Sequence, residues 1–133
     1  MLTKKRQTEI QTYVDVLQPI LCLRDWKLTV ANEPVEDEND AATIRCIYGT
    51  HHAYINIGVS FDDHTPEQQR HLLVHELIHP HLNRIKGAVI NVLNQGGRTE
   101  YEVGKAQLVD ECEYATDSLA DALAPFCPLP QWA

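Results

Sequence analysis

The segment that most constrains this chain is residues 70–82 (RHLLVHELIHPHL), which holds four of the seven histidines. His71, His75 and His79 follow one another at four-residue steps, a spacing that places all three on one face of a helix. The preceding residues 65–68 (Thr-Pro-Glu-Gln) predict where that helix begins. Threonine is a good N-cap, proline suits the first helical position, and glutamine completes a capping box. We therefore expect a helix from residue 66 that carries the histidines.

Within this segment, His75 and His79 form the pattern H-E-x-x-H with Glu76 between them. Residues four apart on a helix lie about 6 Å apart along its axis, so two imidazoles can converge on one ion. Zinc prefers such nitrogen ligands, and catalytic zinc sites keep one position open for water. The apolar residues of the segment fill the opposite arc of the helix and would bury it. The pattern predicts that His75 and His79 bind zinc and that Glu76 lies beside the metal-bound water.

Three neighbouring residues complicate this prediction. His71 and His79 are eight residues apart, about 12 Å along a helix, so both cannot bind the same ion. We expect His71 to lie at the rim or to make a structural hydrogen bond. Pro80 removes the N–H that would bond to the Glu76 carbonyl, so the helix either kinks there or ends one residue after His79. His81 is a possible substitute ligand, although its spacing from His75 is poor.

The last helical segment offers a third ligand. Glu113 and Asp117 lie four residues apart on one face, together with the small or modest residues Ala106, Val109 and Ala120. Glu113 fits as a ligand, and Asp117 fits as the acceptor for the free N–H of a ligand histidine. The alternative is a solvated helix face, because further acidic residues lie nearby.

His75-Glu-Leu-Ile-His79 followed by Glu113-x-x-x-Asp117 resembles the gluzincin metallopeptidases. The resemblance implies zinc ligands His75, His79 and Glu113, with Glu76 as general base and Asp117 as the partner of a ligand. The order of elements is similar to that of minimal single-domain gluzincins and of small phage and prophage metallopeptidases. It implies a minimal zincin-like fold.

The rest of the chain predicts an α+β fold in one domain, residues 1–133. We expect a small, mostly antiparallel three-stranded sheet and two helices besides the one that carries the histidines. Gly87 and residues 96–97 interrupt the uncertain connection before the last helix. The predicted elements are an N-terminal helix (residues 4–22, disturbed near Pro19), a strand (26–30), an acidic loop (33–40), a hairpin (42–48 and 53–61, with Ile55, Ile57, Val59 and Phe61 on one face), a final helix (99–124) and a proline-rich tail (125–133).

Composition narrows the class of protein. The formal net charge of −8 makes nucleic acid a poor partner. Four scattered cysteines form no C-x-x-C pair, which favours reduced thiols over a zinc ribbon or disulfide framework. No apolar run is long enough for a membrane span, and polar residues interrupt any signal-peptide core. We expect a cytoplasmic protein without a membrane partner.

Together these patterns predict a zinc-dependent peptidase that acts on an extended peptide or protein substrate. Residues 53–61 would form the edge strand above the cleft, with Tyr54 and Asn56 contacting substrate. By the resemblance, Tyr101 is the first choice for stabilising the oxyanion, ahead of Tyr114 and residues 51–52 (His-His). The alternative is a non-catalytic zinc-binding scaffold that works as a binding or adaptor protein.

Overall fold

The structure, a computed structural model, describes residues 2–35 and 37–132, and in them the chain forms the predicted α+β fold. Residue 36 of the expected acidic loop and residue 133 of the expected tail lie outside the described part. The elements are three helices, α1 (Lys4–Ile20), α2 (Pro66–Leu93) and α3 (Arg98–Leu123), three strands, β1 (Lys27–Val30), β2 (Ala42–Cys46) and β3 (His52–Ile57), and two short 3-10 helices, η1 (Val59–Asp63) and η2 (Ala124–Phe126).

The three strands form one sheet in the order β1-β3-β2, with β3 in the centre. β3 pairs with β1 in parallel and with β2 antiparallel, so the sheet is mixed where we expected a mostly antiparallel one. The prediction that residues 53–61 form an edge strand was wrong, because β1 occupies the second side of β3. The edge strand above α2 is instead β2.

The strand β3 is also shorter than predicted. It ends at Ile57, and the chain turns into η1, which leaves Val59 81% exposed while Phe61 is buried. Gly58 stands at the turn, where a Cβ would lie 1.9 Å from the carbonyl oxygen of Asp40, so the chain requires a glycine here. The alternation of apolar residues in the sequence continues to Phe61, although the strand has already ended.

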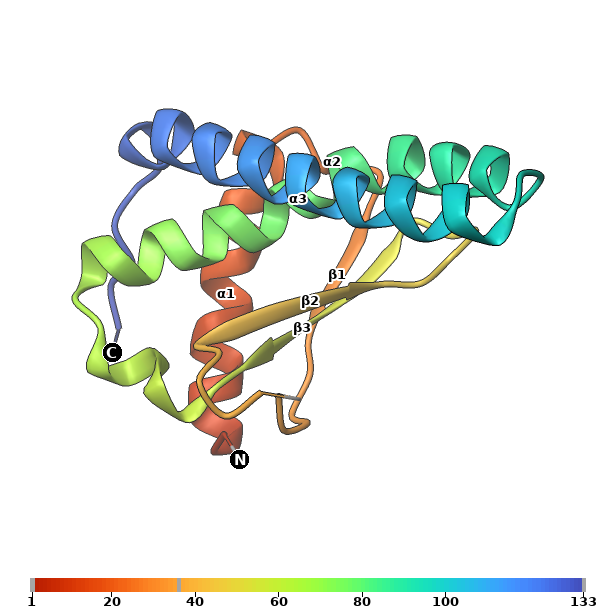
Figure 1. The fold of residues 1–133 in the computed structure, drawn as a ribbon. Helices are drawn as coiled ribbons and strands as arrows, with labels where there is room; N and C mark the ends of the chain where they lie inside the picture. Colours follow the sequence, from red (N-terminus) through yellow and green to blue (C-terminus); the bar gives the residue numbers. More distant parts are fainter. Residues whose placement is uncertain (1, 36, 133) are drawn as a thin grey trace.

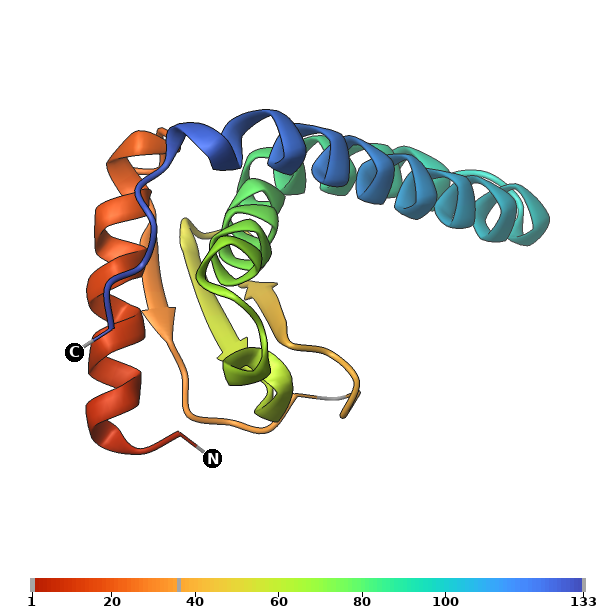
Figure 2. The same cartoon turned by 90° about the vertical axis from the view of Figure 1, so that its left-hand side faces the viewer.

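The core lies between one face of the sheet and the helices α1 and α2 (Figures 1 and 2). Alternate residues of β3 point into it, so Ile55 is fully buried, whereas its neighbours in the strand are only partly buried. Ile10 and Leu17 line the inner face of α1, and Leu77 that of α2. This packing fixes α2 with its histidine face turned away from the core.

Helix α2 continues through Pro80 to Leu93, and it changes direction part-way along its length (Figure 2). Proline interrupts the helical hydrogen-bond ladder, which is a common cause of such bends. The second half of α2 and the facing half of α3 form an antiparallel hairpin that projects beyond the sheet (Figure 2). Gly87 lies inside the helix, and only residues 94–97 connect α2 to α3.

The C-terminal tail returns across the body of the protein. Trp132 packs edge-on against Tyr13 and Phe61, with ring centroids 5.6 and 6.4 Å away, and its indole N–H donates to the Gln69 side chain at 2.8 Å. The Arg70 guanidinium donates to the Cys127 carbonyl at 3.0 Å. None of the helices in the described ranges combines the length and apolar character needed to cross a membrane.

Candidate metal centre

The first turns of α2 form as the sequence predicts and orient the histidine face. The Thr65 side chain accepts from the Gln68 backbone N–H, and the Gln68 side chain accepts from the Thr65 backbone N–H, so the capping box is complete. The apolar residues of the opposite face are buried, and among them Leu73 and Leu77 are fully so. The helix is therefore held by its core side, which leaves the histidines partly exposed and free to meet other groups.

His75, Glu76 and His79 form a compact group on this face. One potential ligand atom from each of the three residues lies within 4.8 Å of the others, and the two imidazole rings are 5.2 Å apart between centroids. Glu113 reaches the same place from α3. Its two carboxylate oxygens lie 3.6 Å from His75 Nε2 and 3.4 Å from His79 Nε2. The predicted pair of helices thus brings all three expected ligands together around one point.

Asp117 lies one turn beyond Glu113 and contacts the other nitrogen of His75. Its Oδ1 is 2.9 Å from His75 Nδ1, an ion-pair contact that favours a proton on this nitrogen. In the tautomer that this contact favours, Nε2 carries the lone pair and points toward Glu113. The sequence prediction gave Asp117 this position as the partner of a ligand histidine.

This set of donors fits a zinc ion. Two imidazole Nε2 atoms and one carboxylate are three protein ligands of the kinds that catalytic zinc sites use, and they leave a fourth position for water. Asp117 lies against the other nitrogen of the His75 ring, the place where metal-binding histidines usually have a carboxylate partner. Glu76 also lies within the group, but Glu113 is the carboxylate that approaches both Nε2 atoms.

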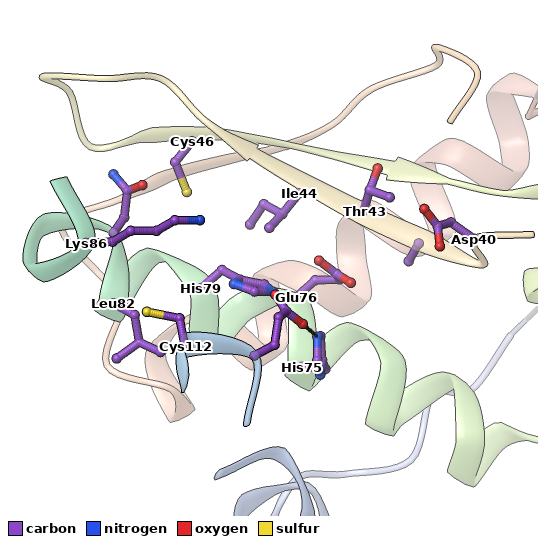
Figure 3. A pocket seen from close by; sticks show the side chains of 13 residues that line it. Asp40, Thr43, Ile44, Cys46, His75, Glu76, His79, Leu82, Lys86 and Cys112 are labelled. Atoms are coloured by element: carbon purple, nitrogen blue, oxygen red, sulfur yellow. Dashed lines mark ion pairs between the residues drawn. The ribbon is translucent and has the colours of Figure 1, made fainter. Parts of the chain in front are cut away.

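A cavity of about 530 Å³ adjoins the group and separates α2 from the edge strand β2. Figure 3 shows β2 passing above the histidines, with Asp40 at one end of the cavity and Cys46 and Lys86 at the other. Cys112 enters from α3. The cavity runs alongside β2, which contributes Ala42, Thr43, Ile44 and Cys46 to its wall.

The electrostatics of the group follow from burial and from its concentration of carboxylates. Burial and, to a smaller extent, the charges of Glu113 and Asp40 raise the pKa of Glu76 to about 8, against the opposing effect of the Ile44 backbone N–H. Burial also lowers the pKa of His79, against the charge of Glu113. A cation at this point would favour the ionised form of Glu76. Neutral imidazole is the form that binds metal.

The other histidines of the segment have separate partners. His71 Nε2 lies 2.8 Å from Asp121 Oδ1 on α3, which confirms the expected structural hydrogen bond. His81 Nε2 lies 2.6 Å from the Leu21 carbonyl at the end of α1, so this ring is directed away from the group of candidate ligands. His81 satisfies a terminal helix carbonyl, and His79 remains the candidate for the second ligand.

The residues predicted to contact substrate or the oxyanion do not join the group. Tyr101 is twelve residues before Glu113 on α3, about 18 Å along the axis, and lies beside Lys105 in a separate shallow hollow. Tyr54 and Asn56 point to the face of β3 opposite the core and do not line the cavity.

The weaker candidates for the oxyanion role lie elsewhere as well. Tyr114 is 72% exposed and does not line the cavity. His51 stacks on Trp26 and approaches Asp25 at 3.1 Å, and the neighbouring His52 packs against Tyr54.

The residues of the cavity wall that were not predicted include four with ionisable side chains: Asp40, Cys46, Lys86 and Cys112. Lys86 follows His79 by seven residues, two helical turns, so the helical pattern itself could have placed it on the histidine face. The positions of Asp40 and Cys46 depend on how the predicted hairpin of β2 and β3 packs against α2, which the sequence does not specify.

Family models, curated proteins and solved structures were all compared with this chain, and none of the three comparisons found a match.

Proposed function

We propose that this protein is a zinc-dependent peptidase of the gluzincin type. The observation that carries the proposal is the convergence of His75, His79 and Glu113, with Asp117 in contact with the first histidine. These residues come from two helices that are separated in the sequence. A purely structural zinc would normally have four protein ligands and would need no adjacent base, whereas Glu76 stands beside the three ligands here.

The residues of this cluster have distinct tasks in peptide hydrolysis. A zinc ion bound there would lower the pKa of a water molecule and polarise the scissile carbonyl. Glu76 accepts a proton from the attacking water and then gives it to the leaving amine. The Ile44 backbone N–H favours the ionised form of this carboxyl group. Asp117 holds the His75 ring so that its Nε2 faces Glu113.

The edge strand β2 supplies a binding surface for an extended peptide. The Ala41 carbonyl accepts a hydrogen bond from the Gly58 N–H, and the Ile47 N–H donates to the His52 carbonyl, so both face β3. In an antiparallel ladder such residues alternate with residues whose backbone groups face the other way, here Ala42, Ile44 and Cys46. Their N–H and C=O groups lie on the open edge of the sheet, where a peptide can add as a further strand.

The second candidate function is a zinc-binding scaffold without catalysis. The observation that favours it is the remote position of Tyr101, since a peptidase of this kind gains much of its rate from a donor to the oxyanion. The two candidates share the metal ligands and differ in whether Glu76 performs chemistry.

The substitution Glu76→Gln separates the two candidates, because it keeps the size of the side chain but removes its basicity. Zinc content is measured by mass spectrometry, and cleavage is measured on an unfolded protein and a mixed peptide library. The matched control is Glu67→Gln, an exposed position in the first turn of the same helix. We expect Glu76→Gln to keep its zinc and to lose about 10²–10⁴-fold in rate, or roughly 3–5.5 kcal/mol of barrier stabilisation.

The outcomes are distinct. If the native protein binds one zinc per chain and cleaves nothing in the library, the scaffold function replaces the peptidase. Activity that survives Glu76→Gln belongs to a contaminating protease. If neither form binds zinc, both candidates fall.

A further inference from the structure

Lys86 lies in the wall of the cavity, two helical turns beyond His79 on the same face of α2. Its side chain is partly buried and extends into the space between α2 and Cys46 on β2 (Figure 3). The ammonium is close enough to Cys46 and His79 for its charge to act on both. It therefore points along the same cleft that the metal group borders.

The charge of Lys86 is not matched by an ion pair. Over residues 2–35 and 37–132, none of the salt bridges present includes this ammonium. It is also the only lysine or arginine in the cavity wall of that part of the chain, where the acidic residues are Asp40, Glu76 and Glu113. A partly buried cation without a partner favours an anion that enters the cleft.

The position of Lys86 fits one residue of a bound peptide. Its Cα lies about 10 Å beyond that of His79 along the helix axis. An extended peptide advances about 3.3–3.6 Å per residue, so Lys86 is within reach of a group about one to three residues from the bond at the metal. Peptides offer two such anions, an acidic side chain and a free C-terminal carboxylate.

We propose that Lys86 determines substrate specificity by binding a carboxylate of the peptide beside the metal group. This inference rests on the proposed peptide-binding function. β2 runs from the Asp40 end of the cleft to the Cys46 end, and antiparallel pairing is slightly the more stable arrangement. A peptide bound antiparallel to β2 has its N-terminal part beside Lys86. The carboxylate therefore belongs to a Glu or Asp on the N-terminal side of the scissile bond.

The test measures binding separately from cleavage. Zinc-loaded Glu76→Gln protein is titrated into end-blocked fluorescent peptides that differ at one position, Glu, Gln or Lys, and binding is followed by anisotropy. A further peptide without acidic residues carries a free C-terminal carboxylate. The same peptides are tested after adding Lys86→Met, Lys86→Glu or Lys86→Arg. The control is Lys105→Met, a lysine on α3 outside the cavity.

We expect the Glu peptide to bind about tenfold more tightly than the Gln peptide, which corresponds to about 1.4 kcal/mol. Lys86→Met should remove that difference without weakening the Gln peptide, and Lys86→Glu should favour the Lys peptide. Lys86→Arg should retain the preference, and Lys105→Met should change nothing. If only the free C-terminal carboxylate gains affinity through Lys86, the anion is the peptide terminus and the peptide lies parallel to β2.

A preference for Glu that persists in Lys86→Met, or no preference in any form, overturns the proposal, as does the absence of any peptide binding. The proposed peptidase activity fails in a different way. A native protein that cleaves nothing, yet binds carboxylate peptides through Lys86, loses the catalytic function and keeps the specificity site. Cleavage that needs Glu76 but ignores the charge of the peptide removes the role of Lys86 alone.

Discussion

Two aspartate–histidine pairs on the same two helices allow a sharp test of the metal centre. Asp117 lies 2.9 Å from His75, a proposed ligand, and Asp121 lies 2.8 Å from His71, which is not one. Replacing Asp117 by asparagine keeps an acceptor near Nδ1 but removes its charge. Loss of such a partner of a ligand histidine typically weakens metal binding 10–100-fold. Asp117 is 65% exposed, so solvent screens the contact and we expect a value near tenfold, or about 1.4 kcal/mol.

The assay is zinc competition against a chromogenic chelator at fixed pH, with Asp121→Asn as the matched control. Both variants lose one carboxylate at nearly the same distance from a histidine, on adjacent turns of α3. A loss of affinity confined to Asp117→Asn identifies the role of that residue as orientation of the ligand. Equal losses in the two variants would show a general effect of charge on α3. An unchanged affinity in Asp117→Asn would remove Asp117 from the site.

Three further predictions follow from particular contacts. Glu113→Ala should weaken zinc binding far more than Glu111→Ala, because only Glu113 reaches both histidines; equal losses in the same chelator competition would contradict the ligand assignment. Trp132→Ala should lower the free energy of unfolding in urea by about 2–3 kcal/mol, less than for a fully buried tryptophan, and no change would show that the tail does not stabilise the fold. Burial raises the pKa of the Cys46 thiol to about 11, so its alkylation should be slow at pH 8 and accelerate up to about pH 11. The Cys46→Ser variant identifies which thiol reacts, and an alkylation rate that has already reached its plateau near pH 8 would contradict the raised pKa.

The helices could be predicted because their signals are local. Thr65 and Gln68 cap the start of α2 only three residues apart, and the predicted ends of α1 and α3 lie within a few positions of the observed ones. The end of α2 was not predicted, because Pro80 and Gly87 suggested an interruption that the helix passes through. The order of strands in the sheet, in contrast, depends on contacts between residues that are far apart in the sequence. β1 pairs in parallel with β3 across more than twenty residues, and nothing in the alternation of either strand specifies that neighbour. The end of β3 depends on how closely Gly58 approaches Asp40.

The same distinction holds for the site. His75 and His79 share a face of one helix, and Glu113 and Asp117 share a face of another, so two helices in contact are enough to bring them together. Tyr101 was chosen by resemblance, without a constraint on its distance from Glu113, although twelve helical residues already separate the two.

Pro80 connects the metal centre to the shape of the cleft. The proline lacks the N–H that would bond to the carbonyl of Glu76, yet α2 stays helical on both sides, and the rings of His75 and His79 remain 5.2 Å apart. The bend in α2 sends its second half away from the body, alongside α3 (Figure 2). Lys86 still lines the cavity, whereas Val92, farther along, is 69% exposed on the projecting hairpin. Pro80 therefore does not separate His75 from His79, and the bend in α2 limits how much of this helix borders the cleft.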